Sequence, residues 1–128
     1  MNLVTQFLKL IFNISLLLLI IVSVFPGSLA GLILYGDLER QPELIQNSLN
    51  ISFNHFIAYF YVSLLGFLLY SRNKNLKNLI LGLFFLSIIL ELLHIIIPNR
   101  AFELSDIIGN ILGVLVAYLV LKIYLLFR

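Results

Sequence analysis

One stretch of the chain, residues 91–110, brings together two glutamates, an aspartate, a histidine and an arginine. Its sequence is ELLHIIIPNRAFELSDIIGN. In a helix, Glu91 shares a face with His94 at i+3. Asp106 likewise shares a face with Asn110 at i+4. A carboxylate beside an imidazole can transfer protons or supply ligands to a metal ion, so this stretch is the first candidate for a functional site.

Metal binding is the first chemistry to consider. The Glu91-x-x-His94 spacing matches the pair used in di-iron helical bundles, and His55 and Asp106 are further candidate ligands. Those bundles need a second Glu-x-x-His and more carboxylates than this chain offers. The chain also has no cysteine, which excludes thiol catalysis and cysteine-based metal ligation. We therefore expect no metal and no cofactor.

Acid/base catalysis is the second chemistry to consider. Glu91 and His94 could act as a proton-transferring pair on a lipid-linked head group, with Arg100 binding a phosphate through its forked donors. No activated nucleophile accompanies them in the sequence. The residues leave catalysis open and favour binding.

The rest of the chain is strongly apolar. Of its 128 residues 62% are hydrophobic and 11% are charged, and the mean hydropathy is +1.11. Such a chain is stable in lipid, so we expect membrane lipid as a partner. Eight basic residues against six acidic ones set membrane orientation and do not indicate a nucleic-acid partner.

Four segments are apolar over about the 20 residues that a membrane crossing needs. We expect transmembrane helices at about 3–25, 53–70, 79–97 and 106–127, with a long loop at 26–52. This predicts an all-α, polytopic membrane protein with one domain, residues 1–128. Ser28-Leu29-Ala30 before Gly31 has the small-residue character of a signal-peptide cleavage site, but the preceding apolar stretch is long for a signal peptide, so we expect a retained helix.

The positive charges predict the orientation, because Lys and Arg are enriched on the cytoplasmic side. One side would carry Lys9, Arg72, Lys74, Lys77, Lys122 and Arg128, and the other only Arg40 and Arg100. Both termini are therefore expected in the cytoplasm. Loop 26–52 would lie outside, with its apolar residues 29–35 on the bilayer surface.

Glu91 would lie about six residues inside the outer end of the third helix, roughly 10 Å below the hydrocarbon boundary. An ionised acid near a helix centre costs about 2.5 to 3.5 kcal/mol, so Glu91 should face a partner or a cavity. His55 and Tyr59 open the second helix on one face. We therefore expect one polar cluster on the outer side of the bundle, made of His55, Tyr59, Glu91, His94, Arg100, Asp106 and Asn110.

Several of these residues have a purely structural alternative. Asp106 could cap its helix, and Arg100 could bind lipid phosphate at the membrane surface. Asn110 could make a hydrogen bond between helices, and His55 could be a satisfied polar helix end. The small residues Gly109, Gly113 and Ala117, four apart, predict close helix packing.

The motifs Glu91-x-x-His94, Pro98-x-Arg100 and Asp106-x-x-x-Asn110-x-x-Gly113, after His55-Phe56-x-x-Tyr59, together resemble the signature of VanZ-like membrane proteins. That family usually has Gln in place of His94, and an Asp-Lys pair in place of Ile51 and Ser52. The resemblance implies a small multi-pass protein of the bacterial cytoplasmic membrane. It also implies that the family-type site residues are His55, Glu91, Arg100, Asp106 and Asn110.

The family namesake is associated with low-level resistance to the glycopeptide teicoplanin, and the resemblance implies no agreed reaction. Two hypotheses follow. In the first, the polar cluster binds an envelope component, such as a lipid-linked precursor or a glycopeptide-type drug. Arg100 would meet an anionic group, and Glu91 with Asp106 would hold Arg100 and His55 in place. In the second, the protein is an accessory or structural subunit that binds other membrane protein subunits.

Overall fold

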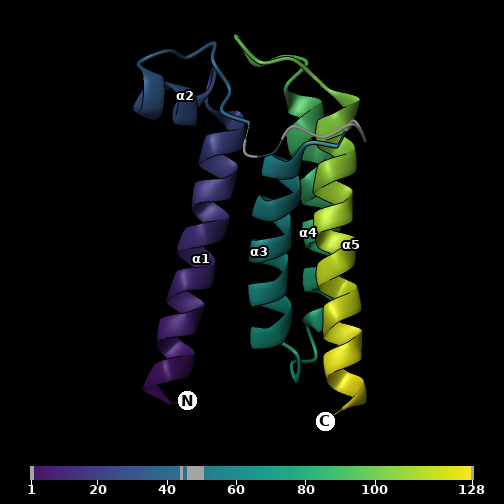
Figure 1. Cartoon of the computed structure of the whole chain (residues 1–128). Coiled ribbons are helices and arrows are strands. Elements are labelled where there is room, and N and C mark those ends of the chain that lie inside the picture. The colour runs from purple at the N-terminus through teal and green to yellow at the C-terminus, as the bar shows by residue number, and fades with distance from the viewer. Residues whose placement is uncertain (1, 44, 46–50, 128) are drawn as a thin grey trace.

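The computed structural model describes residues 2–43, 45 and 51–127. Over these residues the regular secondary structure is helical, as predicted. The helices are α1 (Leu3–Val24), α2 (Leu29–Tyr35), α3 (Phe53–Leu69), α4 (Leu76–Leu93) and α5 (Leu104–Leu126) (Figure 1). Residues 44 and 46–50 of the predicted loop 26–52, and both terminal residues, lie outside the described residues.

Three described helices, α1, α4 and α5, are long and apolar enough to cross a membrane. The apolar helix α3 has 17 residues. It is therefore about 26 Å long, slightly less than the roughly 30 Å of a hydrocarbon core. The four-span topology and the placement of the termini remain predictions.

The third predicted segment, 79–97, was wrong at its outer end, because α4 already ends at Leu93. A proline disfavours helical geometry in the residue before it, so Pro98 acts against continuation through Ile97. Residues 94–97 form tight turns instead, in which the His94 N–H donates to the Glu91 carbonyl oxygen at 3.0 Å. Glu91 therefore lies in the last turn of α4. The predicted position of Glu91, about six residues inside the outer end of this helix, was wrong.

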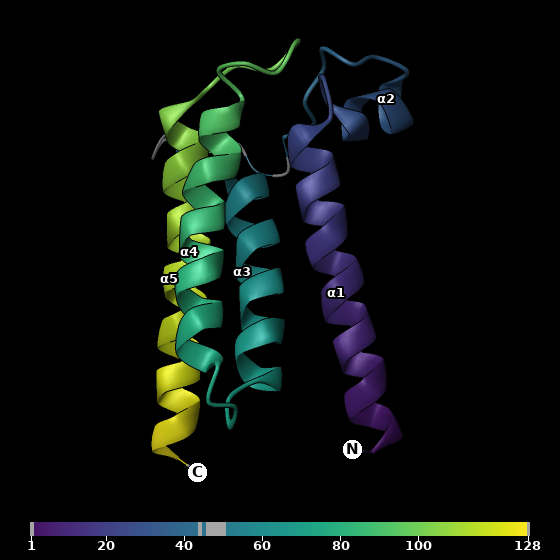
Figure 2. The same ribbon diagram turned by 180° about the vertical axis from the view of Figure 1, so that it is seen from behind.

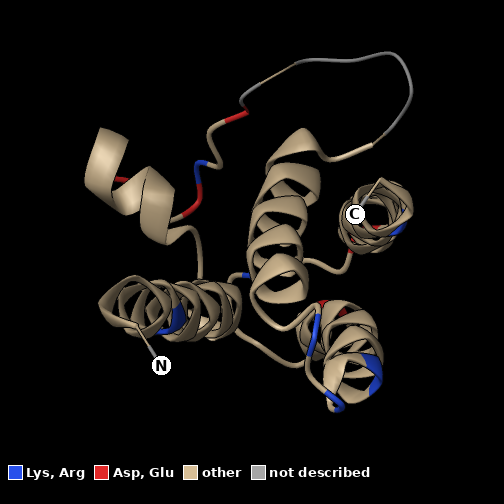
Figure 3. Ribbon diagram, turned by 90° about the horizontal axis from the view of Figure 1, so that it is seen from below, with Lys and Arg blue, Asp and Glu red and all other residues tan. Residues whose placement is uncertain are grey.

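The helix α3 lies at the centre of the bundle and packs against α1, α4 and α5 (Figure 3). Its most extensive contact is with α5, where two glycines let the backbones approach closely. A Cβ atom on Gly109 would lie 2.5 Å from the Ser52 carbonyl oxygen, and one on Gly113 would lie 2.6 Å from the Phe56 carbonyl oxygen. Ala117, the next small residue on this face, is fully buried.

The helix α1 lies beside the bundle formed by α3, α4 and α5 (Figures 1 and 2). Its buried contact is Phe12, whose ring lies where a side chain on Gly66 of α3 would be. Most other side chains of α1 are apolar and exposed, such as Leu3 and Phe7. An exposed apolar surface of this kind is stable in lipid and costly in water.

The short helix α2 lies beside the C-terminal end of α1 (Figure 1). The Ser28 hydroxyl accepts a hydrogen bond from the Gly31 N–H at 2.9 Å, and Gly36 ends the helix in the left-handed conformation at φ 69°. Ile33 and Leu34 project their apolar side chains outward. The end of the bundle that carries α2, where α1 and α4 end and α3 and α5 begin, is called the α2 end below.

Candidate functional site

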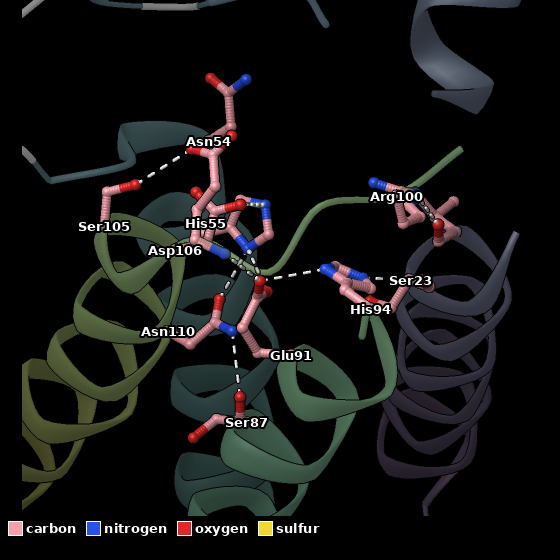
Figure 4. A network of polar contacts seen from close by, with 12 residues as sticks. Ser23, Asn54, His55, Ser87, Glu91, His94, Arg100, Ser105, Asp106 and Asn110 are labelled. Carbon is pink, nitrogen blue, oxygen red and sulfur yellow. Dashed lines mark hydrogen bonds and ion pairs between the residues drawn. The ribbon is translucent and has the colours of Figure 1, made fainter. Parts of the chain in front are cut away.

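Three helix ends meet at the α2 end and bring polar residues from distant parts of the sequence together (Figure 4). They are the start of α3, the end of α4 and the start of α5. A buried network forms there from His55, Glu91, His94, Asp106 and Asn110. These are five of the seven residues of the predicted polar cluster, and four of them are buried, whereas the His55 side chain is 20% exposed.

Glu91 is 1% exposed and lies at the centre of this network. Its Oε1 is 3.0 Å from Nδ1 of His94 and accepts a hydrogen bond from the Glu103 N–H at 3.3 Å. Nε2 of His94 lies 3.0 Å from the Ser23 carbonyl oxygen of α1. Because a carbonyl oxygen only accepts, Nε2 carries a hydrogen, and one proton lies between Nδ1 and the Glu91 carboxylate. The pair therefore connects α4 to α1.

His55 is oriented by Asn110. The Asn110 side-chain amide donates to the Ser87 carbonyl oxygen at 3.0 Å, which directs its Oδ1 toward Nδ1 of His55 at 2.9 Å. Since Oδ1 accepts, Nδ1 of His55 carries the hydrogen. Nε2 of His55 then faces Oδ2 of Asp106 at 3.3 Å. This chain of contacts connects α3, α4 and α5.

Arg100 occupies a different position from the one expected. Its Nε donates to the Phe25 carbonyl oxygen at 3.1 Å, and its Nη2 donates to the Val22 carbonyl oxygen at 2.6 Å. The guanidinium thus satisfies carbonyl groups at the C-terminal end of α1, where a positive charge also meets the negative end of the helix dipole. Burial lowers the pKa of Arg100 from its usual value, and the charges of Glu91 and Asp106 oppose this shift.

A small cavity of 150 Å³ lies between α1, α2 and α3. His55, Tyr59, His94 and Arg100 line it, together with apolar residues such as Leu19. Tyr59 is thereby placed beside the buried network, with its ring buried. All seven predicted cluster residues consequently lie at the α2 end, in the network or at the wall of this cavity.

A larger basin of 840 Å³ opens beside the small cavity, and both are lined by Asn54 and Arg100. Asp106 of the buried network forms part of its wall. Its described lining residues include four acidic side chains and one cation, namely Glu39, Glu43, Glu103, Asp106 and Arg100. This acidic basin therefore suits a ligand group that is positively charged or donates hydrogen bonds.

The sequence reasoning missed the groups that the network uses from the main chain. The carbonyl oxygens of Ser23 and Ser87 and the N–H of Glu103 have no signature in the sequence, because every residue carries them. Glu103 is one of the three acidic residues within residues 91–110, but the helical spacing used for the other residues did not mark it as a member of the cluster. His55, Glu91 and Asp106 also each offer an atom that could bind a metal ion.

Comparison with known proteins adds one finding. A family model described as VanZ/LLP1 matches residues 6–127, nearly the whole chain. Curated proteins and solved structures give no match.

Proposed function

The chain belongs to the VanZ/LLP1 family, and from this premise we propose that it is a four-span protein of the bacterial cytoplasmic membrane that binds the head group of an amphiphilic envelope component at its α2 end. The lipid-linked precursor and the glycopeptide-type drug considered from the sequence are candidates for this component. Three of the proposed spans are the long apolar helices α1, α4 and α5. The fourth is α3, whose residues beyond the first turn are mostly apolar.

The distribution of charge supports an orientation with the α2 end outside. The start of α1, the α3–α4 connection and the end of α5 lie together at the opposite end of the bundle (Figure 1). Those segments carry Lys9, Arg72, Lys74, Lys77 and Lys122. By the positive-inside rule, that end faces the cytoplasm. The acidic basin then faces the compartment in which envelope components are assembled.

The acidic basin is the observation that carries the proposal. Its volume of 840 Å³ is in the range of small-molecule sites. It lies at the end of a bundle whose sides are apolar, so a lipid tail can remain beside the helices while its head group enters the basin. The buried network behind it fixes the wall residue Asp106 through the 3.3 Å contact with His55.

The charges of the basin favour a head group that contains a protonated amine. Glu103 and Asp106 line it on one side, and Glu39 lines it from the loop after α2. The two donors of Arg100 named above are used by α1 carbonyls, which leaves this residue less able to bind an anion than the sequence suggested. An ammonium group among several carboxylates gains charge-assisted hydrogen bonds.

Binding of short-chain lipids to the purified, delipidated chain in detergent would test the proposal. Phosphatidylethanolamine, which carries an amine, should bind at least tenfold more tightly than phosphatidylglycerol. The double variant Glu39→Gln/Glu103→Gln should lose this preference. Asp37→Asn, which removes a carboxylate from outside the basin lining, should keep it.

Equal binding of the two lipids, or an unchanged preference in the double variant, would contradict the proposal. If the chain binds neither lipid and is recovered from membranes only with other subunits, the accessory-subunit hypothesis is favoured. No step of bond making or breaking is part of this proposal.

A further inference from the structure

We propose that His55, Glu91 and Asp106 form a binding site for one divalent transition-metal ion, of which Zn²⁺ is the first probe. One ligand comes from each of α3, α4 and α5, and the ligand atoms all lie within 4.8 Å of one another. From the sequence we expected no metal, because the Glu91-x-x-His94 pair lacks the second pair that a di-iron site needs. The structure brings together a different set of ligands, in which His55 and Asp106 join Glu91. This inference does not depend on the proposed head-group binding.

The spacing of the ligand atoms fits one ion. Nε2 of His55 and Oδ2 of Asp106 are 3.3 Å apart. Two ligands of a tetrahedral Zn²⁺, each about 2.0 Å from the ion, are also about 3.3 Å apart. Glu91 offers the third ligand atom, because one such atom from each of the three residues lies within 4.8 Å of the others.

The ligands are oriented by residues that do not themselves bind. Asn110 accepts the hydrogen of His55 Nδ1 and so leaves Nε2 as the nitrogen that faces Asp106. Metal-binding histidines commonly have their second nitrogen held in this way by a carbonyl or carboxylate oxygen. His94 and the Glu103 N–H hold Oε1 of Glu91, which leaves Oε2 as the ligand atom.

Oε2 of Glu91 is an independent indication of a ligand. It is buried and has no hydrogen-bond partner among the residues that the structure describes. It lies 3.9 Å from Nδ1 of His55, whose hydrogen is accepted by Asn110, so it makes no hydrogen bond there. A buried carboxylate oxygen without a partner is costly, and a metal ion bound between Glu91 and Asp106 would remove that cost.

The proposed site is accessible. Asp106 lines the acidic basin and His55 lines the small cavity, so two of the three ligands border open space. Three protein ligands leave at least one coordination position for water or a ligand oxygen, as in catalytic rather than structural zinc sites. A nitrogen ligand favours Zn²⁺ over Mg²⁺ and Ca²⁺, which prefer oxygen ligands only.

Metal titration of the full-length chain in detergent, after chelator treatment and without added lipid, tests the proposal. Isothermal titration should give one Zn²⁺ per chain, with binding at least tenfold tighter than for Mg²⁺ or Ca²⁺. Glu91→Gln and Asp106→Asn should each weaken Zn²⁺ binding by at least tenfold. Asn110→Ala should weaken it by about 10-fold to 100-fold through the orientation of His55.

Asp37→Asn is the matched control, because it removes a carboxylate that lies outside both the basin lining and the ligand set. It should bind Zn²⁺ like the unaltered chain. Unchanged Zn²⁺ binding in both ligand variants, or no saturable site in the unaltered chain, would overturn the proposal. Asp106 lies in the first turn of α5, so Asp106→Asn tests the site by itself if Glu91→Gln does not fold.

Discussion

Replacing Glu91 by alanine should destabilise the bundle by about 3 kcal/mol. A buried ion pair that loses one partner typically costs about 3 to 5 kcal/mol, because the remaining charged or polar group stays buried without a partner. Here that group is His94, which is 3% exposed and bonded to Glu91 Oε1 at 3.0 Å. The Glu103 N–H also loses its acceptor, but Glu103 is exposed and water can replace Glu91. The effect should therefore be at the lower end of the range.

Unfolding of the purified chain by denaturant in mixed micelles, followed by far-ultraviolet circular dichroism, measures this loss. The midpoint should shift while the slope with denaturant stays constant, because the surface exposed on unfolding changes little. Glu91→Gln keeps an oxygen that can accept from His94 and should cost about half as much as the alanine variant.

Glu103→Ala is the control for this experiment. It removes an exposed acid twelve residues away whose side chain is bonded to the Ser105 hydroxyl at 3.3 Å. Surface substitutions of this kind change stability by about 0.5 kcal/mol or less. If Glu91→Ala and Glu103→Ala shift the midpoint equally, the reasoning from the buried network is refuted.

Three further predictions concern packing, α1 and orientation. Gly113→Ala should destabilise the bundle by about 1 to 3 kcal/mol, because the new Cβ would lie 2.6 Å from the Phe56 carbonyl oxygen. Gly82→Ala, with no atom within 4 Å of the new Cβ, should be neutral or stabilising in the same unfolding assay. Arg100→Ala should loosen α1 and speed limited proteolysis of the connection between α1 and α2, since the Phe25 and Val22 carbonyl oxygens lose their donors; equal proteolysis of Arg100→Ala and Arg72→Ala would contradict this. Because the chain has no cysteine, Ala101→Cys should react with a membrane-impermeant maleimide in intact cells and Asn73→Cys only after lysis; the reverse pattern would show that the orientation is inverted.

The apolar helices could be predicted well because each is determined by its own composition. A segment that contains about 20 apolar residues can hardly adopt another structure in lipid, where backbone groups must be bonded internally. The starts and ends were less accurate where a local signal competed with hydropathy. Residues 95–97 are three isoleucines that hydropathy favours as helix, yet α4 ends at Leu93 and Pro98 follows them. Hydropathy alone does not contain that information.

The sequence predicted which residues belong to the candidate site, but it did not predict which of them contact one another. Periodicity placed Glu91 with His94 and Asp106 with Asn110, and the structure brings both pairs into the buried network. The position of Arg100 could not be predicted, because it depends on two α1 carbonyl oxygens more than 70 residues away in the chain. Backbone acceptors become specific partners only when helices are packed.

The sequence by itself determined that this chain is helical and apolar and that it carries a small set of polar residues near a few helix ends. Local composition and spacing suffice for these properties, since they need no knowledge of neighbouring helices. The tertiary structure decided which of those residues meet. Close approach of α5 to α3 at Gly109 and Gly113 sets the helices in register, and this register places His55 between Asp106 and Asn110, beside Glu91. Packing distances between helices are a property of all their side chains together, and no single motif encodes them.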